Sequence, residues 1–271
     1  MSTSSNHASL SEGRLIQRYK RFLVDVVIAS GEQPTTAHCA NPGSMRGLIE
    51  EGARVWLSDS YDPNDPKTHK RKLRYSLEHI ELSETPTRPA ATICVNTLRA
   101  NAVAHQGISA GRVSALKGIT LRPEVAWDRG AERARLDFAL CDPHATAPSA
   151  PIGYLEVKSA TLSLAPHEAA FPDSVTDRGQ RHLKALMEIK RAGLRAVLLF
   201  VIMRDDARSF RPAHEIDPRY AALLQEARDA GVEIYAHVCH LDPTAPLTPL
   251  NNTAGVTLGA EVPIVWRAPS P

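Results

Sequence analysis

Polar and apolar residues alternate in short runs over the first third of the chain, a pattern typical of half-buried β-strands. A long run spans residues 18–30 and ends at Gly31. Four further runs follow, each bounded by Gly, Pro, Asn or Asp, at residues 35–40, 53–60, 70–82 and 91–96. Five short strands with little helix between them predict a small barrel of the OB type.

The segments on either side of this barrel are polar. Residues 1–13 lack the apolar core of a signal peptide and predict a frayed tail. Residues 84–91 place two prolines among small polar residues, which predicts an exposed linker. We therefore expect a disordered tail (residues 1–12), an OB-fold-like barrel that binds nucleic acid (residues 13–85) and a second domain (residues 90–271).

Helical and strand patterns alternate in this second domain. A helix over residues 97–107, ended by Gly107, precedes three strands at residues 119–128, 133–142 and 152–164. The later elements are a helix over residues 176–192, a buried strand over 195–204, a helix over 218–231 and a strand over 232–241. This order predicts an α/β sandwich around a mixed sheet.

Composition and charge narrow the class of protein. With 43% hydrophobic and 23% charged residues, the 271-residue chain has the composition of a soluble globular protein. Its formal net charge of +2 means that affinity for nucleic acid must come from local basic patches. No run is long enough to span a membrane, and the four dispersed cysteines indicate reduced thiols in the cytoplasm. The His38–Cys39 and Cys239–His240 neighbours point to opposite faces of a strand, which disfavours zinc.

Three residues carry the strongest chemical signal: Asp137, Glu156 and Lys158. Glu156 and Lys158 are two positions apart in a strand, so their side chains share a face about 7 Å apart. Asp137 lies in the preceding strand and can join them if the two strands form a hairpin. Two carboxylates and an ammonium at one point are typical of a site that cuts phosphodiester bonds with Mg²⁺ or Mn²⁺.

The same acid-x-lysine triplet occurs elsewhere in the chain. Glu188 and Lys190 lie in a helical pattern, where positions i and i+2 do not face each other. Asp65 and Lys67 lie in a proline-rich turn. The strand context therefore favours Glu156, although a plain cross-strand ion pair on a surface hairpin stays an alternative.

Further residues could complete such a site. The carbonyl of Val157 could add a third oxygen ligand, and Glu124 could be an extra ligand or an exposed strand residue. At the start of the following helix, Arg178 and Gln180 could contact phosphate or serve only as surface and capping groups.

The barrel offers its own candidates for binding DNA. Asn41, Gly43 and Ser44 surround Pro42 in a turn whose N–H groups could bind an anion. Basic residues flank aromatic ones in two further segments, which suits contacts with the backbone and with bases, although such runs are also common on solvated surfaces. These basic residues are Arg18, Lys20, Arg21, Arg71, Lys72 and Arg74.

These landmarks together resemble the sugar fermentation stimulation protein (SfsA) family over nearly the whole chain. The matching segments include HCANPGSM, RKLRY, RLDFAL, YLEVKSATL and FPDSVTDRGQRHL. The resemblance implies an OB-like barrel followed by a PD-(D/E)xK nuclease-like domain, with DNA as partner. It also implies Asp137, Glu156 and Lys158 as the nuclease-like core, with Glu124 and Gln180 where the family carries Glu and Gln. Pro42 departs from the family, in which threonine is common.

Three functions follow as expectations. The first is a DNA-binding protein that cuts DNA with Mg²⁺ or Mn²⁺. The second is a DNA-binding regulatory protein that keeps the nuclease fold without cutting. The third is an enzyme acting on a small phosphorylated metabolite, which would need a closed pocket. The chain could act alone or as a homodimer.

Overall fold

A computed structural model describes residues 9–128, 133–144, 150–247 and 253–266. Its first unit is a closed barrel of five strands: β1 (Ser11–Tyr19), β2 (Leu23–Ile28), β3 (Pro34–His38), β4 (Arg54–Asp59) and β5 (Tyr75–Leu82). The strand order is β3-β2-β1-β4-β5, and a pairing of His38 with Ser76 joins β3 to β5. The inward-facing apolar residues of these strands form one core, as the alternating pattern predicts. The expected OB-type barrel is confirmed.

The start of the barrel differs from the sequence-based expectation. The run over residues 18–30 forms two strands, because Lys20 and Arg21 adopt positive φ angles of 46° and 64° and reverse the chain. The strand before this turn begins at Ser11, and Leu10 is buried. Residues 1–8 of the expected tail lie outside the described residues, whereas Ser11–Gly13 belong to the barrel.

The proline-containing segment after β5 is exposed, as expected, but it is a turn and not a linker. Thr85 and Arg88 exchange two main-chain hydrogen bonds of 2.8 and 3.2 Å. The chain then returns as β6 (Ala91–Cys94), which pairs with β5 on one side. On the other side the N–H of Cys94 donates to the carbonyl of Met203 at 2.9 Å, so this strand connects the barrel to the second domain.

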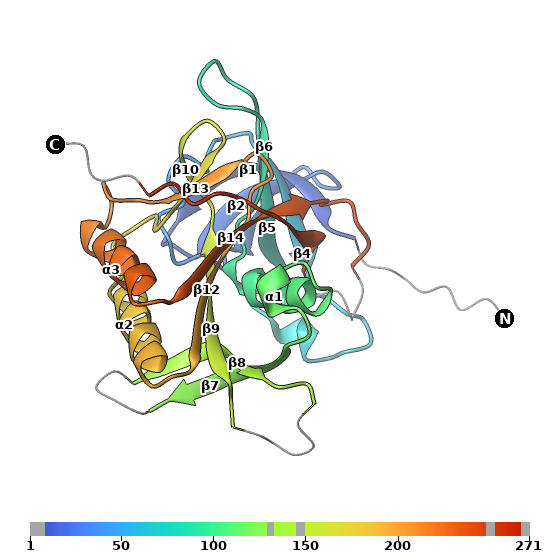
Figure 1. Cartoon of the computed structure of the whole chain (residues 1–271). Coiled ribbons are helices and arrows are strands. Elements are labelled where there is room, and N and C mark those ends of the chain that lie inside the picture. Colours follow the sequence, from blue (N-terminus) through green and yellow to red (C-terminus); the bar gives the residue numbers. More distant parts are fainter. Residues whose placement is uncertain (1–8, 129–132, 145–149, 248–252, 267–271) are drawn as a thin grey trace.

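The second domain is built on a six-stranded mixed sheet of order β15-β14-β12-β9-β8-β7. Its strands are β7 (Thr120–Trp127), β8 (Ala134–Cys141), β9 (Gly153–Ala160), β12 (Arg195–Ile202), β14 (Glu233–Leu241) and β15 (Val256–Glu261). Helices α2 (Asp177–Arg191) and α3 (Pro218–Asp229) cover one face, and α1 (Ala100–Ser109) covers the other (Figure 1). The predicted α/β sandwich is therefore confirmed, with α1 running two residues past Gly107.

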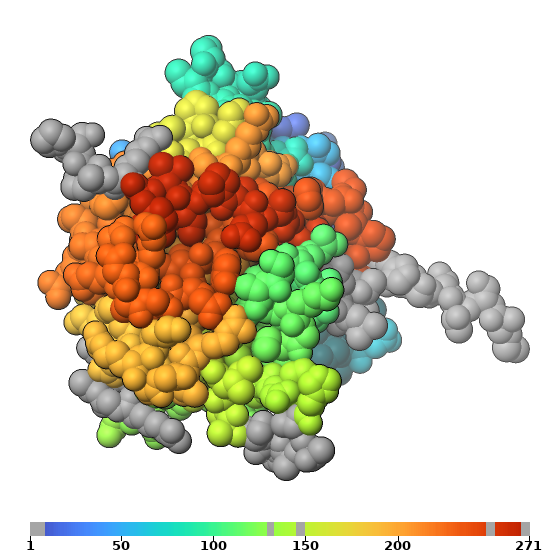
Figure 2. All heavy atoms as spheres, in the orientation of Figure 1, coloured from blue at the N-terminus to red at the C-terminus, as the bar shows by residue number. Residues whose placement is uncertain are grey.

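A small sheet was not predicted. The run over residues 152–164 breaks after β9, and β10 (Leu162–Ala165) pairs with β11 (Glu168–Phe171), which lies parallel to β13 (Ser209–Pro212). Figure 2 shows the C-terminal segment, in dark red, as a band across one face beside α3 and α1. None of the helices in the described part of the chain is long and apolar enough to cross a membrane.

Candidate active site

The candidate site lies where strands β8 and β9 separate. Their antiparallel ladder ends at the pairing of Phe138 with Leu155. Beyond this point β8 continues beside β7, and β9 continues beside β12. The Asp137 carboxylate enters the gap, where its Oδ2 accepts a hydrogen bond of 2.8 Å from the main-chain N–H of Val157. A carboxylate thus takes the place of a strand partner where the two strands part.

The environment of Asp137 favours its protonated form. Burial raises the pKa of Asp137, and the nearby charge of Glu156 raises it further. Hydrogen bonds from Val157 and from Asn101 of α1, the latter at 2.8 Å, act in the opposite direction. A divalent cation beside Asp137 and Glu156 would favour the charged form of Asp137.

Glu156 is only 2% exposed and is held through one of its two oxygens. Its Oε1 accepts a bond of 2.5 Å from the Lys158 ammonium and also contacts Nδ1 of His182. Burial alone would raise the pKa of Glu156, but Lys158 and His182 outweigh it and lower the pKa. The other oxygen, Oε2, is buried and has no hydrogen-bond partner among the described residues. A buried acceptor of this kind suits a cation ligand.

His182 is a site residue that the sequence reasoning missed. It reaches Glu156 from the buried face of α2, its Nδ1 lies 3.3 Å from the Lys158 ammonium, and Arg178 contacts its Nε2 at 3.4 Å. The available signal was a histidine in register with the apolar stripe formed by Leu186 and Ile189. A buried polar residue in such a stripe needs a partner, and Glu156 is that partner.

The oxygen donors available for a cation are few. Within the described residues, no group of three or more His, Cys, Asp or Glu side chains could hold a metal ion. The oxygens that could hold a cation at this site are those of Asp137, Glu156 and the carbonyl of Val157. N–H and C=O of one strand residue point to the same side, so this carbonyl faces the gap that Asp137 enters. Two or three protein oxygens suffice for Mg²⁺, which retains several waters.

Two other predicted residues lie apart from Glu156. Glu124 has a positive φ of 57° and forms an exposed ion pair of 2.5 Å with Arg135, although it lines the same open cleft of about 390 Å³ as Asp137. Gln180 is buried and donates to both carboxylate oxygens of Asp217, at 3.2 and 3.1 Å. Asp217 in turn caps α3, so the contacts of Gln180 join two helices and not the acids.

The turn in the barrel that was predicted to bind an anion already holds one from the same chain. Asp173, in the second domain, accepts a 3.2 Å bond from the N–H of Met45, and its carbonyl accepts a 2.8 Å bond from the Ser44 hydroxyl. Asn41 is buried and closes the turn by accepting the Gly43 N–H at 2.8 Å. The turn therefore connects the two domains.

Some of the predicted basic residues form hydrogen bonds or ion pairs with other described residues, and the others, here called open, do not. Arg18 donates to four main-chain carbonyls, including those of Asn41 and Gly43 at 2.9 and 3.0 Å, and Arg74 forms a bidentate pair with Asp59. The open residues are exposed and have no side-chain partner within the described part of the chain: Lys20, Arg21, Arg71 and Lys72. Of the basic residues predicted in the barrel, these four can contact a phosphate backbone without breaking an interaction within the described part of the chain.

Comparison with known proteins agrees with this architecture. Residues 16–86 match the SfsA N-terminal OB domain, and residues 98–245 match the sugar fermentation stimulation protein RE domain. The chain is 48% identical to the sugar fermentation stimulation protein homolog of Ectopseudomonas mendocina, over 86% of this chain and 92% of that protein. It is 45% identical to the homolog of Magnetococcus marinus, over 91% and 97%.

A solved structure shares the fold. The SfsA of Pyrococcus furiosus, solved in complex with Ca²⁺, superimposes with a TM-score of 0.75 at 24% identity, over 95% of this chain and 96% of that one. The matches cover both domains in the same order. The chain belongs to the sugar fermentation stimulation protein (SfsA) family.

Proposed function

We propose that this protein binds DNA and cuts phosphodiester bonds with Mg²⁺ or Mn²⁺ at the β8–β9 site. The observation that carries the proposal is the hydrogen bond from Val157 to Asp137, which holds one acid beside Glu156 and Lys158. The cation would be held by Asp137, Glu156 and the Val157 carbonyl, and it supplies a Lewis acid that activates water and neutralises phosphate charge. The Ca²⁺ bound to the Pyrococcus protein is a hard cation that prefers oxygen ligands, as Mg²⁺ does.

The protein residues have separate tasks in this proposal. Lys158, a point charge with three donors, orients the attacking water or stabilises the oxyanion that develops on the phosphate. His182 holds Oε1 of Glu156, which leaves Oε2 for the cation. Lys20, Arg21, Arg71 and Lys72 supply the charges that attract the DNA backbone. We place the protein in the cytoplasm, because all four cysteines are free thiols.

A second candidate is a DNA-binding regulatory protein that does not cut. One observation favours it: Glu156 is paired with both Lys158 and His182. A buried acid compensated in this way is stable as a purely structural ion pair.

A cleavage assay separates the two candidates. Purified protein is incubated with single-stranded, hairpin and duplex DNA in Mg²⁺, in Mn²⁺ or in EDTA, and binding is measured in parallel across a salt series. We expect metal-dependent cutting that Asp137→Asn abolishes, with binding retained and weakened by salt. Wild-type protein that binds DNA but cuts none of these substrates with either cation would establish the second candidate. Absence of salt-sensitive binding would refute both.

A further inference from the structure

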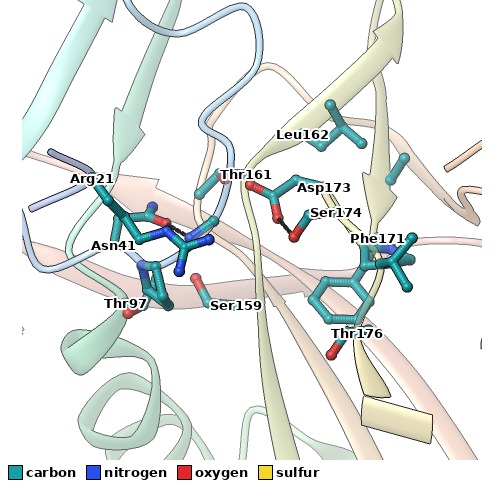
Figure 3. Close-up of a pocket in the computed structure, with 15 residues that line it drawn as sticks. Arg21, Asn41, Thr97, Ser159, Thr161, Leu162, Phe171, Asp173, Ser174 and Thr176 are labelled. Carbon is teal, nitrogen blue, oxygen red and sulfur yellow. Dashed lines mark hydrogen bonds between the residues drawn. The ribbon is translucent and has the colours of Figure 1, made fainter. Parts of the chain in front are cut away.

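The cutting site leaves unused a cleft of about 350 Å³ between the two domains, here called the inter-domain cleft. One wall comes from the barrel, with Arg21 and Asn41. The other comes from the end of β11, with Phe171, and from the loop before α2, with Asp173 (Figure 3). Ser159 and Thr161, from the end of β9, lie between these walls.

We propose that the inter-domain cleft binds one unpaired nucleotide of a single-stranded DNA segment and so selects single-stranded or frayed DNA over continuous duplex. This inference rests on the proposed DNA-binding function and gives it a substrate class. The volume is at the small end of the range of about 300 to 1,000 Å³ found for small-ligand sites. Such a space takes one nucleotide but not a stacked base pair.

The cleft adjoins the proposed cutting site along two elements. Ser159 lies two residues beyond Val157 on β9, which is about 7 Å. Thr97 lines the cleft, and Asn101, one helical turn later, donates to Asp137. A strand seated in the cleft would therefore lead directly to Asp137 and Glu156.

The polar groups of the cleft suit a phosphodiester and a sugar. Arg21 is exposed and its guanidinium has no partner within the described residues, so it can pair with a phosphate without breaking an ion pair. The hydroxyl oxygen of Ser159 is buried and has no hydrogen-bond partner among those residues. An unpaired buried hydroxyl and an unpaired arginine that line the same cleft suit a ligand with both a hydrogen-bond acceptor and a negative charge.

The cleft also has apolar side chains. Val175, which lines it, is 68% exposed and is one of five large hydrophobic side chains exposed among the described residues. Phe171 lines the same cleft. Bases stack on aromatic side chains in single-strand-binding proteins.

The walls of the cleft are held at a fixed separation. Asp173 binds Ser44 and Met45 of the barrel loop. Gly43 has no room for a side chain, because an added Cβ would lie 2.3 Å from Oδ2 of Asp173. The cleft therefore cannot widen to admit a duplex unless these contacts break.

Binding of labelled DNA by the full-length chain in EDTA tests this inference, since no cutting occurs there. The probes are a fluorescein-labelled oligothymidine, the same strand in a duplex, and free thymidine monophosphate as competitor. We expect Val175→Ser to weaken single-strand binding about tenfold and to leave duplex affinity unchanged. Arg21→Gln should weaken single-strand binding more than duplex binding, but it should weaken both, because Arg21 also contributes to the attraction of the DNA backbone. The mononucleotide should compete poorly.

Matched controls are available on the same elements. Ile152→Ser removes an exposed apolar side chain at the far end of β9, and Arg191→Gln removes a charge at the far end of α2. Both should bind as the wild type does. Three outcomes would overturn the inference. The cleft variants could bind single-stranded DNA as the wild type does, or they could lose single-strand and duplex binding equally. Thymidine monophosphate could displace the labelled strand as effectively as the unlabelled strand does. If the wild type still cuts DNA in that case, the proposed function stands and only the cleft assignment fails.

Discussion

The chain contains two acid-x-lysine segments in regular structure, and their surroundings differ completely. On β9, Glu156 is 2% exposed and lies 2.5 Å from the Lys158 ammonium, beside a strand gap that Asp137 fills. On α2, Glu188 and Lys190 are half-exposed on a helix, where residues two apart point in different directions. The same short pattern thus gives a buried cluster in a strand and separate surface groups in a helix. The scaffold, and not the pattern, decides whether chemistry is available.

The largest expected difference between the two segments is in how substitutions change the rate of DNA cleavage. Asp137→Asn or Glu156→Gln should lower the rate of Mg²⁺-dependent DNA cleavage by about a thousandfold or more, because each substitution removes a cation ligand. Glu188→Gln should leave the rate unchanged. Initial rates on a labelled oligonucleotide measure this, with circular dichroism as a check of folding. Similar rates for the β9 and α2 variants would remove the distinction between the segments.

The next largest difference is expected between substitutions of Lys158 and of Lys190. Lys158→Met should reduce cleavage about 100- to 1,000-fold, the usual loss when one donor to a developing oxyanion is removed. It should also lower the thermal midpoint, since Glu156 loses a buried partner. Lys190→Met should do neither. Fluorescence anisotropy should show that both variants still bind DNA, and a Lys158 variant that cuts normally would exclude the assigned role.

Substitution of His182 should have a smaller effect, on the affinity for the cation, because His182 positions Glu156. His182→Ala removes the contact that holds Oε1, so Mn²⁺ affinity should fall about tenfold, as for other groups that orient a metal ligand. Titration calorimetry with Mn²⁺ measures this directly. The matched substitution is His240→Ala, which removes an exposed histidine of β14. Equal Mn²⁺ affinity in the two variants would show that His182 only fills space.

The smallest effect is on stability, and the two acids should show opposite signs. The pKa of Asp137 is raised by burial and by Glu156, so stability falls as pH rises from about 4 through the raised value. At pH 7 in EDTA, Asp137→Asn should therefore raise the thermal midpoint by a few degrees. Burial opposes ionisation of Glu156, but Lys158 and His182 lower its pKa overall, so its charge stabilises the fold above about pH 4.

Glu156→Gln should thus lower the thermal midpoint at pH 7. Its effect should shrink as the pH is lowered through the depressed pKa, because the wild-type acid then loses its charge as well. Melting curves of both variants between pH 3 and pH 8 would reveal the two signs. Shifts in the same direction at pH 7 would contradict the assigned environments.

The sequence predicted the architecture and the central trio because both depend on local periodicity. Alternation gave the barrel strands, and the strand context of Glu156 and Lys158 placed them together. Residues joined only by packing were not predictable in this way. His182 reaches Glu156 across 26 positions, and Gln180 turns to Asp217 across 37. The anion expected in the barrel turn proved to be Asp173, more than a hundred residues away.

Two local features account for the other differences between the predicted and the observed fold: backbone strain in one turn and the pairing of short strands. The turn at Lys20 and Arg21 depends on positive φ angles, which neither lysine nor arginine predicts. The parallel pairing of β11 with β13 joins short segments 41 positions apart, which no local pattern encodes.

The measurement that tests the central claim most directly is the binding of Mn²⁺ to metal-free protein. Titration calorimetry measures this binding in the wild type, Asp137→Asn and Glu156→Gln. If the two acids and the Val157 carbonyl form one cation site, the wild type should bind one Mn²⁺ per chain, and either substitution should abolish that binding. Binding that survives both substitutions with unchanged affinity would show that the cation, if it serves the protein at all, is held elsewhere.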